Sequence, residues 1–217
     1  VGISAKGNKN ADYRADGIYY YRTSSRIAVN FQCKEALESY EVDLAFPGNF
    51  TVYNALTAIA ICKRLGLNTE QTVKSIKDVR IGGRFEAYAL PNGATVVIDY
   101  AHNEVSTKSV MNTLAEYKPN RMICVYGGGG NRSKLRRYDM GEVTGAMADL
   151  CILTCDNPRD EEIKDINNDI KIGLAKSNGK YIEIDDRKDA IKYCIENAQK
   201  GDMIVLLGKG HQTYQER

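Results

Sequence analysis

Four polar motifs contain residue types that could take part in chemistry, and each follows an apolar run. They are DYAHN at 99–103, GGGGNRSKLRR at 127–137, DNPRDE at 156–161 and GKGHQ at 208–212. Carboxylates, amides, arginines, histidines and glycines recur among them, and these groups bind charged small molecules. The motifs together therefore indicate a binding site.

The glycine-rich motif fits an anion such as a phosphate or a carboxylate. Its glycines let backbone N–H groups approach a ligand, and its positive charge comes from four side chains: Arg132, Lys134, Arg136 and Arg137. It does not match the G-x-x-x-x-G-K-[ST] phosphate loop, and it lacks the third glycine of the dinucleotide fingerprint. A flexible turn before a solvated basic helix is the alternative interpretation.

The other motifs allow both a functional and a structural interpretation. Arg159 could grip a carboxylate with its planar fork, or DNPRDE could be an ordinary helix start with a surface arginine. His102 and His211 are more simply explained as structural histidines. Outside the motifs, Asn54 lies at the start of an expected helix, where a capping role is the default, and Arg84 and Glu86 could form an ion pair at a hinge.

The apolar runs between the motifs predict the elements that position them. Strands are expected at 94–99, 121–127, 149–155, 181–184 and 202–208, and helices at 104–117, 137–148, 161–175 and 187–199. This alternation predicts an α/β fold with a Rossmann-like, mostly parallel sheet and helices on both faces. Ligands bind such sheets beyond the carboxyl ends of the strands, where all four motifs fall.

The first part of the chain has a different pattern. Short β-rich runs within 13–45 predict a small antiparallel sheet, followed by a helix over 50–66 that ends at Gly66 and another over 69–77. Gly82-Gly83 then predicts a flexible joint before a new set of strands. We therefore expect one domain over 1–82 and a second over 83–217.

Composition narrows the class of protein. Thirty basic and 28 acidic residues leave a net charge of +2, which does not favour a general nucleic-acid surface. No segment resembles a signal peptide or a membrane span. The six cysteines form no C-x-x-C pair, so we expect reduced, structural thiols in a cytoplasmic protein. The chain begins with Val1 in the middle of a pattern, which suggests that it is cut from a longer protein.

The order of the motifs resembles the Mur ligase family, in particular its branch of UDP-N-acetylmuramoyl-tripeptide synthetases. The resemblance covers nearly the whole chain, from ADYRADGI and PGNFTVYNALTAIA through GRFE to the four motifs above and GKGHQTYQ. It implies that 1–82 is the C-terminal part of the central ATPase domain and that 83–217 is the amino-acid-binding domain. The family's phosphate loop, Mg²⁺ ligands and modified lysine would lie upstream of Val1, and no catalytic residue is assigned within this chain.

The implied reaction is an ATP-dependent ligation. ATP phosphorylates the terminal carboxylate of UDP-N-acetylmuramoyl-L-alanyl-D-glutamate, and the amine of an incoming amino acid displaces the phosphate. The protein contributes positioning and charge stabilisation. The DNPR version of the third motif is associated with meso-diaminopimelate, whose additional carboxylate two arginines would match.

The resemblance also assigns roles to individual residues. By it, the ATP-binding residues are Asn54, Arg84 and Asp99, and the amino-acid-binding residues are Arg132, Asp156, Asn157, Pro158, Arg159, Gly208 and Gln212. Three departures from the family pattern stand out: Thr51 replaces an asparagine, Gln212 replaces the glutamate of GKGHE, and Asn131 and Ser133 replace two aspartates around Arg132.

Two other functions remain open at this stage. The first is the same ligation with L-lysine or another amino acid. The second is a stand-alone nucleotide- or amino-acid-binding module, which would need a complete nucleotide site. A phosphate loop encoded upstream in the same frame would exclude the module. Without that loop and its metal ligands, we expect the chain alone to be inactive.

Overall fold

The computed structural model describes residues 1–23 and 26–216. The chain forms two compact units, Val1–Arg80 and Ile81–Arg217, and each has its own sheet. The expected boundary at Gly82-Gly83 lies beside this division. Gly83 is buried with φ of +70°, and a Cβ there would overlap the backbone of Gly210 and His211, so this glycine packs within the second unit.

The first unit is a four-stranded sheet with two helices. Its strands are β1 (Ile3–Ser4), β2 (Tyr13–Arg22), β3 (Ile27–Glu35) and β4 (Glu38–Leu44), in spatial order of sequence, and its helices are α1 (Asn49–Arg64) and α2 (Thr69–Ile76). The last three strands are antiparallel, as the sequence predicts, whereas the two-residue β1 pairs parallel to β2 and was not expected. Phe31, Val52 and Leu56 are fully buried in its core.

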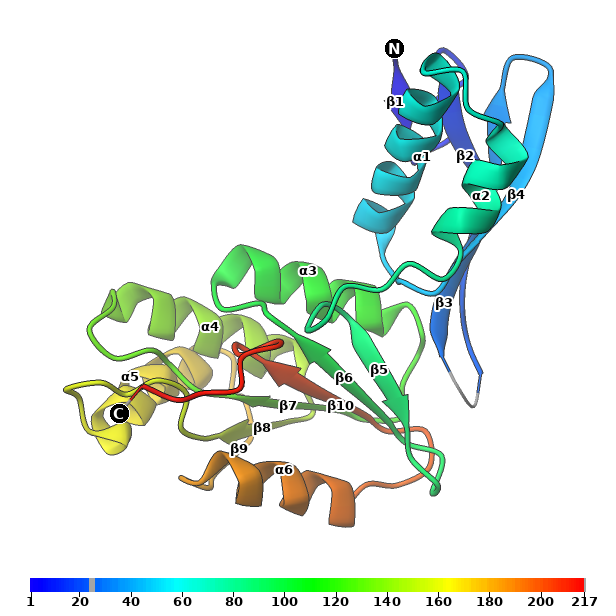
Figure 1. Ribbon diagram of the computed structural model, residues 1–217. Helices are drawn as coiled ribbons and strands as arrows, with labels where there is room; N and C mark the ends of the chain where they lie inside the picture. The colour runs from blue at the N-terminus through cyan, green and yellow to red at the C-terminus, as the bar shows by residue number, and fades with distance from the viewer. Residues whose placement is uncertain (24–25, 217) are drawn as a thin grey trace. The chain divides into compact units, whose positions relative to one another are not determined.

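The second unit is a six-stranded sheet covered by helices (Figure 1). In chain order it contains β5 (Glu86–Ala89), β6 (Thr95–Asp99), α3 (Glu104–Ala115), β7 (Met122–Tyr126), α4 (Lys134–Met147), β8 (Leu150–Leu153), α5 (Ile163–Lys176), β9 (Tyr181–Glu183), α6 (Arg187–Glu196) and β10 (Met203–Leu207). The spatial order is β5-β6-β10-β7-β8-β9, and every pair is parallel except β5 with β6.

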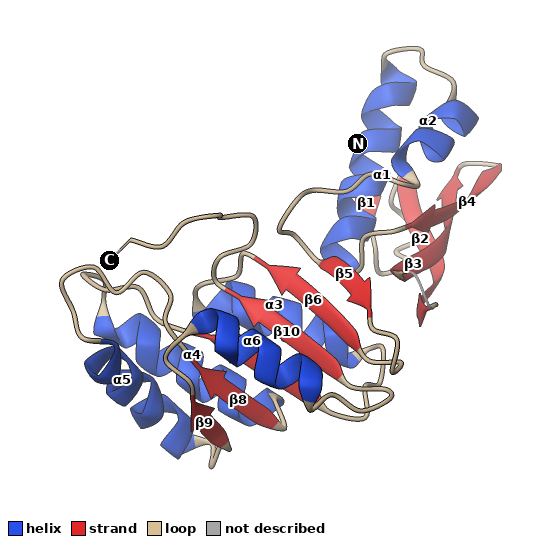
Figure 2. Cartoon of the chain, turned by 60° about the horizontal axis from the view of Figure 1, so that its bottom comes forward, coloured by secondary structure: helices blue, strands red, loops and turns tan. Residues whose placement is uncertain are grey.

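Helices cover both faces of this sheet, which confirms the predicted fold class. The chain moves across the sheet in one direction from β6 to β9, so α3, α4 and α5 lie on one face. It then returns through α6 on the other face to insert β10 between β6 and β7 (Figure 2). The central strands β7 and β10 are buried along their whole length because helices pack on both sides of them.

One helix start differs from its prediction in a way that matters for the site. The basic run KLRR is not a loop, because α4 begins at Lys134 rather than at 137. Ser133 occupies the N-cap position, so Arg136 and Arg137 both lie on the first turns of a regular helix. Because they are consecutive on a helix, the side chains of Arg136 and Arg137 point in different directions.

Candidate functional site

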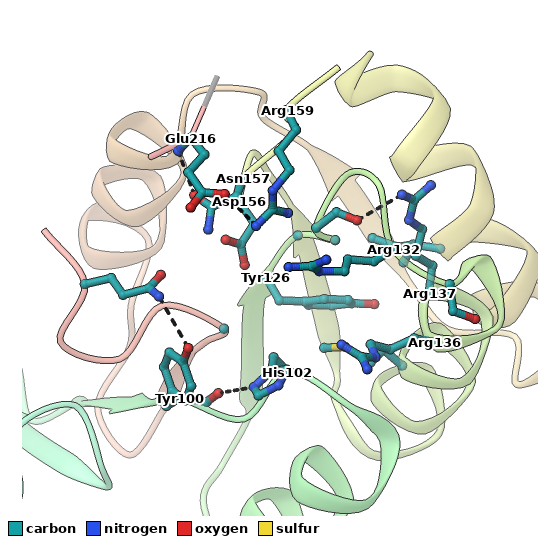
Figure 3. Close-up of a pocket in the computed structure, with 18 of the residues that line it drawn as sticks. Tyr100, His102, Tyr126, Arg132, Arg136, Arg137, Asp156, Asn157, Arg159 and Glu216 are labelled. Carbon is teal, nitrogen blue, oxygen red and sulfur yellow. Dashed lines mark hydrogen bonds and ion pairs between the residues drawn. The ribbon is translucent and has the colours of Figure 1, made fainter. Parts of the chain in front are cut away.

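A cavity of about 390 Å³ opens at the carboxyl edge of the second sheet (Figure 3). It is lined from the loops that follow β6, β7, β8 and β10, where the sequence places its four polar motifs. We name three of these segments: the glycine loop (127–133), the DNPR loop (154–162) and the terminal segment (208–216). The site is therefore assembled from segments far apart in sequence, which the strand order brings to one edge.

The glycine loop and the DNPR loop touch through their backbones. The amide of Gly130 donates to the carbonyl of Asn157 at 2.8 Å. A Cβ on Gly130 would overlap the carbonyl oxygen of Pro158, so only glycine permits this approach. Pro158 is thus placed behind the cavity wall, where its backbone supports the loop contact instead of lining the cavity.

The cationic side chains of the glycine motif differ in their burial and in their contacts. Arg137 is buried and binds the carboxylates of Glu161 and Asp169, each at 2.8 Å. Arg137 lines the cavity, but these two acidic residues already pair with its guanidinium, so a contribution of its charge to a ligand stays a prediction. Arg132 and Arg136 are exposed side chains that line the cavity, and Arg132 has no side-chain partner within 1–23 and 26–216.

Arg132 and Arg159 reach the same part of the cavity from the two loops (Figure 3). Arg132 Cγ and Arg159 Nη1 both lie 3.4 Å from the position that a Cβ on Gly129 would take. Arg159 Nη1 donates to the carbonyl of Gly130 at 2.9 Å, and its Nη2 is 2.5 Å from a carboxylate oxygen of Glu216. Two guanidinium groups at one wall form a site suited to a carboxylate.

Asp156 and Asn157 surround a lysine that sequence reasoning did not assign. Lys209 is 8% exposed, and its Nζ donates to Asn157 Oδ1 at 2.8 Å and lies 3.6 Å from Asp156 Oδ1. Burial lowers the pKa of Lys209, and the nearby Asp156 partly opposes this effect. Gly208 has φ of +101°, and a Cβ there would lie 2.6 Å from Asp156 Oδ2. The sequence could have identified this lysine, since Lys209 lies inside the GKGHQ motif.

The terminal segment also lines the cavity, and its Glu216 reaches Arg159. Gln212 Nε2 is 3.3 Å from the hydroxyl of Tyr100 and 3.4 Å from that of Tyr214. The backbone amide of Glu216 donates to Asn157 Oδ1 at 3.0 Å, which anchors the segment to the DNPR loop. Sequence reasoning assigned no role to Tyr100, Tyr214 or Glu216, although Tyr100 lies inside DYAHN and Tyr214 inside GKGHQTYQ.

The three residues expected at a nucleotide lie outside the cavity lining. Asp99 is buried, and its two carboxylate oxygens accept from the amides of Phe85 at 3.0 Å and Ala101 at 2.8 Å. Burial raises the pKa of Asp99, against the opposing effect of these hydrogen bonds. The Arg84 guanidinium lies over the ring of Tyr100, 5.0 Å from its centroid. Asn54 is exposed on α1 in the first unit.

Neither a membrane-spanning helix nor a cluster of metal ligands is found among the described residues. Among residues 1–23 and 26–216, no helix is long and apolar enough to cross a membrane. In the same part of the chain, no three His, Cys, Asp or Glu side chains are grouped as metal ligands usually are.

The fold and the cavity define a Rossmann-like domain with an arginine-lined cavity at the carboxyl edge of its sheet. Comparison with known proteins gives the family. Residues 83–210 match the family described as "Mur ligase, glutamate ligase domain", and the chain belongs to the Mur ligase family.

Several relatives bear one name. The chain is 44% identical over 192 residues to the UDP-N-acetylmuramoyl-L-alanyl-D-glutamate–2,6-diaminopimelate ligase of Caldanaerobacter subterraneus subsp. tengcongensis, covering 88% of this chain and 40% of that protein. It is 39% identical over 202 residues to the ligase of the same name from Aquifex aeolicus, covering 92% and 41%. The chain thus spans about 40% of the length of these curated relatives.

Solved structures agree with this placement. A structure titled as the same diaminopimelate ligase matches with a TM-score of 0.71 and 32% identity, over 99% of this chain and 43% of that one. The folylpolyglutamate synthase of Mycobacterium tuberculosis matches with a TM-score of 0.69 at 18% identity, over 92% and 46%, and this likeness concerns the fold alone.

Proposed function

We propose that the chain is the C-terminal portion of an ATP-dependent ligase that adds meso-diaminopimelate to UDP-N-acetylmuramoyl-L-alanyl-D-glutamate in peptidoglycan synthesis. Residues 1–82 are the end of its central ATPase domain, and residues 83–217 are its amino-acid-binding domain. The names of the relatives support this proposal. The observation that carries it in this chain is the pairing of Arg132 and Arg159 at one cavity wall.

Diaminopimelate differs from lysine by a carboxylate at the distal end. In the proposed complex Arg132 and Arg159 bind that carboxylate, because guanidinium forks match its planar geometry. Asp156, Asn157, Pro158 and Gly208 shape the wall that holds the rest of the amino acid, and the side-chain oxygen of Gln212 accepts from the distal ammonium. The ligand is thereby oriented with its reacting amine toward the acyl phosphate.

The acyl phosphate forms from ATP and the terminal carboxylate of the UDP-linked dipeptide. Attack by the amine forms the amide bond and expels phosphate, so the protein's contribution is positioning and electrostatic stabilisation. We assign ATP contacts to Asn54, Arg84 and Asp99. The ligands of Mg²⁺ and the UDP-sugar site belong to the part of the ligase upstream of this chain, and the enzyme acts in the cytoplasm.

The test is the steady-state activity of the full-length ligase that contains this chain. Phosphate release with ATP and the UDP-dipeptide should depend on diaminopimelate and be far weaker with L-lysine at the same concentration. Equal or better turnover with lysine would assign the other amino acid. The 217-residue chain should remain at the buffer background in the same assay; turnover by the chain itself would refute its assignment as part of a larger active site.

A further inference from the structure

Arg137 is the most buried cation of the site, and its contacts join three segments. Its side chain is 2% exposed. It donates to both oxygens of Glu161 at 2.8 Å, to Asp169 at 2.8 Å and to the carbonyl of Gly129 at 2.9 Å. One guanidinium on α4 thus binds α5, the DNPR loop and the glycine loop together.

Glu161 extends the connection on the opposite side. Its Oε1 accepts from the amide of Asn131 at 2.5 Å as well as from Arg137. The side-chain amide of Asn131 donates to Asp160 at 2.6 Å. Arg137 bonded to Glu161 is therefore a clamp that fixes the backbone on both sides of Gly130, directly before Arg132, and holds it against the turn that carries Arg159.

We propose that Arg137 and Glu161 are positioning residues that set the spacing between the Arg132 and Arg159 guanidinium groups, and so determine selectivity for an amino acid with a distal carboxylate. This inference rests on the function proposed above. Neither the carboxylate of Glu161 nor the guanidinium of Arg137 needs to contact the ligand. Their effect passes through the Gly129 carbonyl and the Asn131 amide, which lie in the loop leading to Arg132.

Packing of the helices does not require this clamp. A Cβ on Gly141 of α4 would overlap the carbonyl oxygen of Ile170, and a Cβ on Gly173 of α5 would overlap that of Tyr138, so the two helices already touch backbone to backbone. Removing the Arg137 guanidinium altogether would leave the buried carboxylate of Asp169 without its 2.8 Å partner, so the variants that test the clamp keep a polar or charged side chain at each position. The forked geometry of Arg137 toward Glu161 is the feature that these variants alter.

The primary variant is Glu161→Gln in the full-length ligase, because it keeps the size of the side chain and removes the carboxylate that accepts three donors. We expect its KM for diaminopimelate to rise about tenfold or more, since small displacements of binding groups cost up to about 100-fold. The KM for ATP should change by less than about twofold, because the clamp is not part of the nucleotide contacts.

Three further variants separate positioning from charge and from folding. Arg137→Lys keeps the charge but loses the fork, so it should match Glu161→Gln. The double variant should cost no more than either single one, because both break the same clamp. The control is Glu142→Gln, which removes the half-exposed ion pair of Glu142 with Lys176 between α4 and α5, 2.9 Å long, and contacts neither loop. It should leave every KM unchanged.

The outcomes separate the two proposals. A wild-type ligase that does not use diaminopimelate would overturn the proposed function. A wild-type ligase that does use it, with an unchanged KM for diaminopimelate in Glu161→Gln and Arg137→Lys, would overturn the positioning role alone. An equal rise of the KM values for ATP and diaminopimelate, together with a lowered unfolding temperature, would also overturn it, because the pair would then serve only folding.

Discussion

Replacing Arg132 by alanine is the cleanest test of the carboxylate site. Arg132 is exposed, lines the cavity and has no side-chain partner in the part of the chain that the structure describes. Arg132→Ala therefore removes no described contact of the folded protein. Surface substitutions of this kind change the free energy of unfolding by about 0.5 kcal/mol or less.

The effect on ligand binding should be much larger. A hydrogen bond to a charged group contributes about 1.5–3 kcal/mol, and about 1.4 kcal/mol corresponds to a factor of ten. Losing the Arg132 partner of the distal carboxylate should thus raise the KM for diaminopimelate about 10- to 150-fold. Arg159→Ala should have at least this effect and should also destabilise the loops, because Arg159 holds the Gly130 carbonyl at 2.9 Å.

The assay compares the KM values of the full-length ligase for diaminopimelate and ATP, with thermal unfolding measured in parallel. Lys180→Ala is the control, since Lys180 is an exposed cation of the same domain directly before β9, at the amino edge of the sheet. Arg132→Ala should also reduce the preference for diaminopimelate over lysine. Equal changes in the KM values for diaminopimelate and ATP, or an unchanged preference, would refute the role of Arg132.

Three other predictions follow from the same contacts. Gln212→Glu should lower the KM for diaminopimelate about fivefold at an unchanged KM for ATP, because a charged acceptor binds an ammonium about 1 kcal/mol more strongly than a neutral one. A lower KM for lysine alone would contradict the proposed substrate. Gly130→Ala should destabilise the chain by about 1–3 kcal/mol in urea unfolding, since its Cβ would overlap the Pro158 carbonyl oxygen, and unaltered stability would show that the loops can separate freely. Hydrogen bonds from Arg137 lower the pKa of Glu161 from 4.5 to about 2, so the unfolded chain binds a proton that the folded chain does not, and stability should fall as the pH drops from about 4.5 towards 2. Glu161→Gln should lose less stability than the wild type in that window, and identical pH profiles would argue against the ion pair.

The sequence predicted most of the elements because their signals are local. Apolar runs such as MICVY and MIVLL mark buried strands, and Asn68, Asn103 and Asp186 cap helices through their own side chains. The order of the motifs also identified the family, since the residues of each motif are contiguous in the chain. Two strands were missed: the two-residue β1, which pairs with β2, and the edge strand β5, which pairs with β6.

The strand order was decided by tertiary structure. The residues of β10 carry no local signal that this strand lies between β6 and β7. In the structure Val205 of β10 pairs with Val97 on one side and with Cys124 on the other. That insertion carries Gly208 and Gln212 to the cavity formed by the glycine and DNPR loops, and it brings Lys209 to Asn157. Apolar strands buried on both faces are interchangeable by composition, so only their packing with the helices fixes their order.

The arginines of the glycine motif show the same difference between what the sequence determines and what the tertiary structure decides. The sequence determined that Arg132, Arg136 and Arg137 follow a glycine run at the end of a strand, and it therefore predicted an anion site there. It could not determine that Arg137, although it lines the cavity, is paired with Glu161 and Asp169, which lie 24 and 32 positions further along the chain. Charge is a property of the residue, but whether that charge is neutralised depends on which carboxylates the fold brings within hydrogen-bonding distance.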